Sequence, residues 1–231
     1  VLTVQGKIDS TAVANDTVLI GLDMAGTVNF DARGTQSANT INTGSGNGAT
    51  PASVVSANTL TVRTGALRVT TQATPPATTY APGTNGVVLA KVQFDASASA
   101  EDLKVSQFKI KDTTNGTAKT IDIQNITLLV DKDGDSGNNA GTDVALSNTQ
   151  SGTDSGAGND ETFTFNLSGD DQFVVKAGKS LIITVKGNLA GGGTVGSHTF
   201  ATAVADDVTA TGVVTNTQVA EVIDTAAGQA Q

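Results

Sequence analysis

Residues 182–189, IITVKGNL, nearly repeat the first eight residues of the chain, VLTVQGKI. Residue 1 aligns with residue 182, an offset of 181, and aliphatic residues match at every apolar position. The identical pairs are Thr3 and Thr184, Val4 and Val185, and Gly6 and Gly187. An internal repeat shows which segment is the unit of the fold. Because a late element of one copy opens the other, we expect the chain to begin partway through a domain.

The likeness between the copies continues downstream. Each copy is followed by a loop of small residues, an apolar segment (residues 18–22 and 199–204) and a second short segment that ends in glycine (residues 28–34 and 208–212). The strands predicted in the first copy cover residues 1–5, 17–22 and 27–31. Three strands with one apolar face make a poor domain by themselves. We therefore expect the first copy to be an incomplete sandwich.

Composition favours β structure over helix. The 231 residues include 38% hydrophobic and only 3% aromatic side chains, and the remainder is rich in Thr, Gly, Asn and Ser. Thr and Val suit a pleated, half-buried surface, and Gly and Asn suit turns. Apolar residues alternate with polar ones in GVVLAKVQFDA (residues 86–96), where Val88, Ala90, Val92 and Phe94 share one face. Segments of this kind recur roughly every eight to fifteen residues, as in an antiparallel sandwich.

The predicted fold is all-β, with two immunoglobulin-like antiparallel β-sandwich units, the first incomplete within the chain. Residues 1–52 comprise the partial unit and a linker rich in Gly, Ser, Thr and Asn. Residues 53–215 form the complete sandwich, and residues 216–231 form a tail with a strand at residues 218–223. Such linkers are flexible chains or long surface loops.

Charge and cysteine content exclude several classes of function. Thirteen basic residues against 22 acidic ones give a net charge of −9, which disfavours nucleic acid as a partner. No apolar run approaches the roughly 20 residues that span a bilayer, so direct membrane insertion is not expected. The chain contains no cysteine, which rules out disulfides and thiolate metal sites. A Thr-, Asn- and Gly-rich acidic chain of this kind indicates an extracellular or cell-surface location.

Catalysis is not expected. Paired carboxylates must converge in a pocket to act as acid and base, whereas adjacent strand residues face opposite ways. Asp206 and Asp207 are therefore assigned to a turn or edge. His198 is the single histidine of the chain, and we expect it in a surface loop because no triad or zinc site can be built around it.

The loop that begins at residue 131 offers the clearest metal pattern. Calcium prefers hard oxygen ligands, and the oxygen-bearing residues here are Asp131, Asp133, Asp135, Asn139 and Asp143. The spacing departs from an EF-hand loop, since position six is Ser136 and position twelve is Thr142. The alternative is a solvated acidic hairpin loop without metal. Calcium is the only cofactor predicted.

Several phrases resemble a known family. The order TLTVRTGALRV, VVLAKVQFDASASAEDLKVSQFKI, DIQNITLLVD, FVVKAGKSLIITVKGNLAGG and DDVTATG is similar to repetitive exported β-sandwich domains of surface-layer-like and filament-like proteins from candidate-phyla bacteria. The resemblance covers about residues 58–214 and involves no catalytic motif. It implies tandem copies and an architectural role at the cell surface. The incomplete first copy departs from the family pattern.

An incomplete sandwich leaves strand edges unpaired, and a strand from another chain can fill such an edge. Head-to-tail donation does not close on itself and generates filaments. The residues expected in inter-subunit strands are Val1, Leu2, Val4 and Ile8 near the start and Val219, Val222 and Ile223 near the end. We therefore expect a structural subunit of an extracellular, pilus-like homopolymer.

Two alternatives remain open. The chain is a fragment of a longer tandem or surface-layer protein, or it is an adhesin that binds carbohydrate. The adhesin is disfavoured because sugar stacking calls for exposed aromatics, and the chain has no Trp and one Tyr, Tyr80. Glycans are further possible partners. The N-glycosylation sequons begin at Asn15, Asn115, Asn125 and Asn166.

Overall fold

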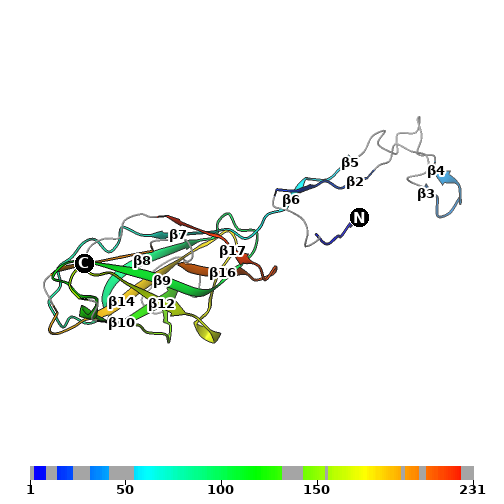
Figure 1. Cartoon of the computed structure of the whole chain (residues 1–231). Coiled ribbons are helices and arrows are strands. Elements are labelled where there is room, and N and C mark those ends of the chain that lie inside the picture. The colour runs from blue at the N-terminus through cyan, green and yellow to red at the C-terminus, as the bar shows by residue number, and fades with distance from the viewer. Residues whose placement is uncertain are drawn as a thin grey trace. The chain divides into compact units, whose positions relative to one another are not determined.

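The computed structural model describes residues 3–8, 15–22, 32–41, 55–131, 143–153, 156–193, 196–202 and 207–224. Contacts divide the chain into two compact units, Val1–Arg63 and Thr64–Gln231, here named the first unit and the second unit (Figure 1). The division falls after Arg63, whereas the sequence analysis places it after residue 52. The reason is that residues 55–61 pair with residues 17–22 of the first unit.

The described part of the first unit holds only two-residue strands. They are β1 (Thr17–Val18), β2 (Gly21–Leu22), β3 (Ala32–Arg33), β4 (Thr40–Ile41), β5 (Val55–Ser56) and β6 (Leu60–Thr61). β1 pairs with β6 and β2 with β5, all antiparallel, so these segments form one long ribbon. β3 and β4 form a separate hairpin. Residues 3–5, the described part of the strand predicted at residues 1–5, belong to no strand, and the prediction at residues 27–31 lies outside the described residues.

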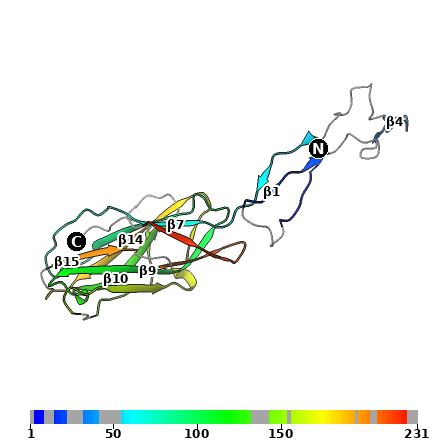
Figure 2. The ribbon, with the colours of Figure 1, turned by 45° about the horizontal axis from the view of Figure 1, so that its top comes forward.

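The second unit is built from two sheets. Its elements are β7 (Leu67–Thr71), β8 (Val87–Asp95), β9 (Leu103–Gly116), η1 (Thr120–Asp122), β10 (Ile123–Asp131), β11 (Asp143–Ala145), β12 (Glu161–Asn166), η2 (Gly169–Asp171), β13 (Phe173–Val175), β14 (Ser180–Leu189), β15 (Gly196–Ala201), β16 (Val208–Gly212), β17 (Gln218–Val219) and β18 (Glu221–Asp224). One sheet has the order β11-β10-β14-β8-β7-β18. The other has the order β12-β9-β16-β17, with β13 and β15 also paired to β9. The prediction of an all-β sandwich is confirmed (Figure 2).

Alternating side chains from both sheets make the core. Phe94 of β8 meets Phe108 of β9 edge-on, with 5.6 Å between ring centroids, and meets Phe173 of β13 at 5.5 Å. Such edge-to-face pairs are favoured by the charge distribution of the rings. A register shift in the β14–β8 ladder places both Leu89 and Ala90 in the core. Val87 is therefore buried, and the predicted inward position Val88 is not.

β14, the later copy of the repeat, is an interior strand. It pairs antiparallel with β10 on one side and with β8 on the other. Gly187 permits this close approach, because an added Cβ would lie 2.8 Å from Leu89 Cδ1 and 3.3 Å from Ile123 Cγ2. The strand is thus surrounded on both edges by strands that precede it in the chain.

The two units share one hairpin geometry. In the β3–β4 hairpin the N–H of Ala38 donates to the carbonyl of Gly34, and in the β16–β17 hairpin the N–H of Asn216 donates to the carbonyl of Gly212, at 2.8 and 2.9 Å. Ala38 and Asn216 have φ angles of 56° and 54°. The strand pairs Ala32–Ile41 and Ala210–Val219 also correspond. The two hairpins therefore share backbone structure, whereas residues 3–8 and β14 do not.

Residues 218–224 are folded onto the second unit. β17 pairs with β16, and β18 pairs with β7 in the single parallel ladder among the described strands of that unit. Residues 218–224 thus occupy the edges of both sheets of their own chain. The described part of the tail predicted from residue 216 is therefore part of the sandwich, because its strands complete these ladders.

Candidate functional site

The first unit carries a groove between residues 4–8 and the β1–β6 ribbon. Its volume is about 940 Å³, and its apolar lining consists of Val4, Ile8, Val18, Ile20, Leu60 and Val62. Most of these side chains are exposed, and the buried core of the described residues lies entirely in the second unit. An exposed apolar groove of this kind makes these residues a candidate binding surface.

The repeat shows what surrounds such a strand when it is complete. Val4 is 62% exposed, whereas its counterpart Val185 in β14 is 0% exposed. Gly6 has open space where a Cβ would point, whereas Gly187 faces two side chains of the flanking strands. The first copy therefore lacks, among the described residues, the neighbours that β8 and β10 provide for the second.

The predicted inter-subunit residues have different positions. Val1 and Leu2 lie outside the described residues, and Val4 and Ile8 line the groove. At the other end, Val219 is buried and Ile223 packs on the core, whereas Val222 is 63% exposed on β18. Donation of residues 218–223 to a neighbour would require these strands to leave their own sheets.

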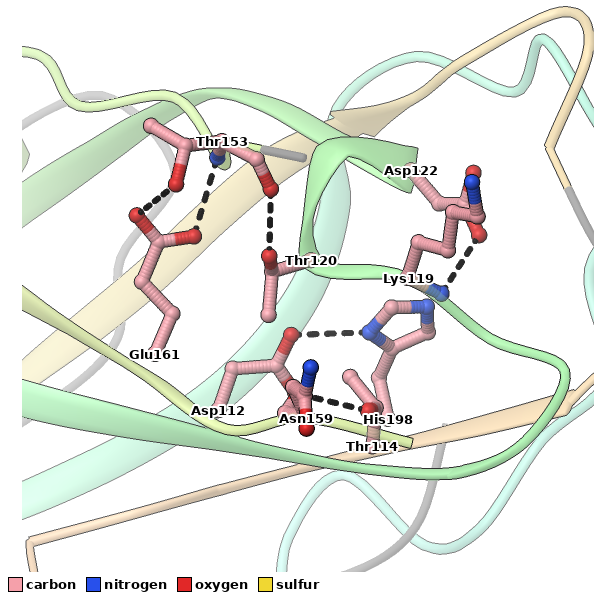
Figure 3. Close-up of polar contacts among 9 residues, drawn as sticks. All are labelled: Asp112, Thr114, Lys119, Thr120, Asp122, Thr153, Asn159, Glu161 and His198. Atoms are coloured by element: carbon pink, nitrogen blue, oxygen red, sulfur yellow. Dashed lines mark hydrogen bonds and ion pairs between the residues drawn. The ribbon is translucent and has the colours of Figure 1, made fainter. Parts of the chain in front are cut away.

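The second unit holds a buried polar pair at one end of the sandwich. His198 Nδ1 of β15 lies 2.8 Å from Asp112 Oδ2 of β9 (Figure 3). The expectation of a surface loop for His198 is wrong, since its side chain is only 7% exposed. The physical reason is strand alternation, which turns His198 and Phe200 toward the core, where their rings stack at 6.5 Å.

Asp112 is the more unusual member of the pair. Its side chain is fully buried, and its Oδ1 has no hydrogen-bond partner among the described residues. Burial raises the pKa of the Asp112 carboxyl, and the hydrogen bond and charge of His198 offset this only in part. The nearby carboxylates of Asp160 and Glu161 raise the same pKa further. A buried group whose protonation is shifted in this way indicates a functional site.

Hydrogen bonds fix the strands around the pair (Figure 3). The Thr114 hydroxyl donates to the carbonyl of Asn159 at 2.7 Å. The backbone N–H of Lys119 donates to Asp122 Oδ2 at 3.0 Å, which holds the Asp122 carboxylate at the start of η1. These hydrogen bonds link the residues on either side of His198 to one another.

A pocket of about 380 Å³ opens beside the pair. It lies where residues 77–82 pass the ends of the two sheets, and both His198 and Asp122 line it. Tyr80, Leu189 and Ile123 supply apolar surface. Its size and mixture of apolar wall with few polar groups are typical of small-ligand sites.

The predicted calcium loop cannot be assembled from the described residues. Asp131 ends β10 and pairs across the ladder with Asp143, which begins β11. Asp133, Asp135 and Asn139 lie outside the described residues. Within the described ranges no group of three or more His, Cys, Asp or Glu side chains is placed to hold a metal. Calcium stays a prediction, and a melting temperature that is unchanged by a chelator would contradict it.

The sequence analysis missed Asp112, Asp122 and the pocket. A usable signal was present in the strand over residues 103–116, where Asp112 follows Ile110 at the spacing of the buried face. A carboxylate on a buried face needs a partner, and the single histidine was the natural candidate.

Comparison with protein families and curated proteins assigns neither a family nor a function to this chain. No protein-family model matches the sequence, and no curated protein matches it significantly. Neither helical turn in the described residues has the length or hydrophobicity of a membrane-spanning helix.

Proposed function

We propose that this protein is a non-catalytic structural subunit of an extracellular filament, assembled when strands of a neighbouring subunit complete the first unit. The observation that carries the proposal is the contrast between the two copies of the repeat. Val4 is exposed in a groove, whereas the matching Val185 is buried between two strands. A partner that supplies such strands would give the first unit the surroundings of β14.

The mechanism is strand addition. An incoming strand forms main-chain hydrogen bonds along one edge, and its alternate side chains enter the apolar groove. In the second unit the partners of β14 are antiparallel on both sides, so the same orientation is proposed for the first. Contacts in which the donor and acceptor surfaces lie on different parts of one chain propagate head to tail.

The class of sandwich, the cellular location and the binding partner of the subunit are part of the same proposal. The two units are assigned to an immunoglobulin-like sandwich class, and the resemblance to exported surface-layer-like and filament-like domains supports a location at the cell surface. The acidic, cysteine-free composition is consistent with that location. The self-association partner is another copy of this chain.

A second source of the strands is a longer polypeptide in which tandem copies follow one another. In that case the first unit is completed within the same chain, as in a surface-layer or multidomain protein. The two sources differ in one property, because only donation between chains makes the assembly depend on protein concentration.

Sedimentation velocity and negative-stain microscopy of the purified chain test the proposal. We expect large species that grow with concentration and fibres of constant width. Leu60→Asp places a charge in the groove and should abolish them. Val174→Asp is the matched control, since Val174 is an exposed valine of β13 in the second unit. A monomer at every concentration would overturn the proposal, as would polymers that Leu60→Asp leaves intact.

A further inference from the structure

The pocket beside His198 serves a purpose that filament assembly does not explain. We propose that it binds one neutral saccharide unit, with His198 Nε2 and the Asp122 carboxylate accepting hydrogen bonds from sugar hydroxyls and Tyr80 covering an apolar sugar face. The proposal is independent of strand exchange, because all lining residues belong to the second unit.

The first step concerns the orientation of the imidazole. Nδ1 faces Asp112 Oδ2, so an ionised Asp112 accepts a hydrogen bond from Nδ1–H, and this tautomer of the neutral imidazole has a lone pair on Nε2. Nε2 has no hydrogen-bond partner in the described part of the chain, yet it is not among the atoms sealed from solvent. Since His198 is otherwise buried and lines the pocket, Nε2 is reached from the pocket.

The second step concerns charge. The described lining contains no Lys or Arg side chain, and its one carboxylate is Asp122. An anionic ligand would meet this carboxylate in a described lining that offers no Lys or Arg side chain, which is unfavourable at close range. Two acceptors, Nε2 and the carboxylate, call instead for a ligand that presents hydroxyl donors.

The third step concerns shape. A volume of about 380 Å³ admits one or two sugar rings, and Tyr80, Leu189 and Ile123 give the wall its apolar character. An aromatic ring with a polar tip suits a ligand that has both C–H and O–H faces. The scarcity of aromatic residues therefore does not argue against sugar binding, because the single tyrosine lies in this pocket.

The fourth step concerns why the pair is present. A buried ion pair is often no more stabilising than apolar residues of similar size, so fold stability alone does not account for it. At the 181-residue offset His198 corresponds to Thr17, which is exposed in the first unit. At this offset the first copy therefore has an exposed threonine where the second copy has a buried histidine.

NMR titration of the intact chain tests the proposal. The chain has one histidine, so its imidazole signals need no assignment among several. The probes are the methyl glycosides of glucose, galactose and mannose, N-acetylglucosamine, sodium glucuronate and n-butylamine. We expect at least one neutral sugar to shift the His198 signals saturably, with a Kd on the order of 1 mM, and glucuronate to leave them unchanged.

Variants separate binding from folding. Tyr80→Ala and Asp122→Asn should each weaken binding about tenfold, the loss of roughly one good contact. Asp170→Asn is the control, because Asp170 is an exposed carboxylate of η2 and does not line the pocket. A dispersed amide spectrum shows that each variant is folded. The proposal is overturned if no neutral sugar shifts the imidazole, if butylamine alone does, or if both pocket variants bind as the parent does.

Discussion

Residues 1–8 and the later residues 182–189 match at every apolar position but have opposite surroundings. In β14 the valine at position 185 is fully buried between two strands, and in the first unit the matching Val4 is 62% exposed. Strand propensity is the same in both copies, so propensity does not decide which of the two valines is buried. Burial of an apolar strand requires neighbours on both edges and a sheet above it. The difference teaches that, within the described ranges, the first copy has the apolar face of a core strand but no sheet packed against it.

The largest expected effect comes from placing a charge at the matched valines. Val185→Asp buries an unpaired carboxylate and should destabilise the second unit by roughly 4 kcal/mol or more. Val4→Asp should change the thermal unfolding of the second unit by less than about 0.5 kcal/mol and should remove any polymer. Calorimetry of the two variants makes the comparison. Equal destabilisation by both would show that the first unit has its own core.

The next effect concerns the histidine that distinguishes the copies. His198→Thr introduces the residue of the first copy and leaves Asp112 buried without its partner, at a cost of roughly 3 kcal/mol. Denaturant unfolding measures the change. The double variant Asp112→Val with His198→Val should lose much less, because no buried charge remains. Additive losses would show that the two side chains do not interact.

The matched glycines give an intermediate effect. Gly187→Ala brings a Cβ to 2.8 Å from Leu89 Cδ1, and overpacking of this kind costs about 1–3 kcal/mol. Gly6→Ala meets nothing within 4 Å and should be neutral for unfolding. If Gly6→Ala also reduces assembly, the first copy packs in the polymer as β14 packs in the second unit.

A smaller effect concerns the hydrogen bonds between Glu101 and the turn of the β16–β17 hairpin. The Glu101 carboxylate accepts hydrogen bonds from the N–H groups of Val214 and Thr215 and from the Thr215 hydroxyl, at 2.8–3.0 Å. Partial burial acts to raise the pKa of Glu101, but these bonds outweigh it and the pKa is lowered. Its contribution to stability is therefore present above the unfolded-state pKa and is lost as the pH falls. Glu101→Gln should cost about 1 kcal/mol at neutral pH and should flatten this acid dependence in pH-dependent melting.

The pH dependence of stability expected from Asp112 has the opposite sign to that expected from Glu101. Its pKa is raised in the folded state, so its contribution is largest below the unfolded-state pKa and declines as the pH rises through the folded-state value. Asp112→Asn in the same melting series serves as the counterpart. If Glu101→Gln and Asp112→Asn changed the pH dependence of the melting temperature in the same direction, the opposite signs assigned to the two carboxyls would be contradicted.

The smallest effect concerns the left-handed residue of the two turns. Asn adopts positive φ at lower cost than Ala, and the matched positions are Asn216 and Ala38. Asn216→Ala should cost about 1 kcal/mol. Ala38→Asn should slow amide exchange at Gly34 and Ala38 about threefold, because the hairpin opens less often. No change in exchange would indicate that this hairpin is not limited by its turn.

Sequence pattern predicted the sandwich because its signals are local. The alternation in residues 86–96 and in LIITVKGNL fixes strands, and the repeat fixes their equivalence. The sequence pattern did not predict the β-bulge in β8, because Leu89 enters the core through a register shift that depends on β14. The boundary at Arg63 also escaped it, since only pairing shows that β5 and β6 return to the first unit.

The site was less accessible to sequence for a related reason. His198 and Asp112 are 86 residues apart and meet because β15 pairs with β9 in one register, with His198 opposite Thr114. No local spacing encodes that register. The pocket adds residues 77–82, a segment without strand pattern that is tied to the end of β14 by the hydrogen bonds of Gly83 and Thr84, far apart from it in sequence.

The turn of the β3–β4 hairpin has the backbone geometry of the β16–β17 hairpin, which pairs with β9. The two hairpins differ at the position that faces Lys104 of β9. Thr211 of β16 lies opposite Lys104 of β9, and its counterpart in the first hairpin is Arg33. Docking the wrong hairpin would set two positive charges directly across from each other, which opposes pairing. Arg33 therefore disfavours pairing of the first hairpin with β9 in the place of β16 during folding.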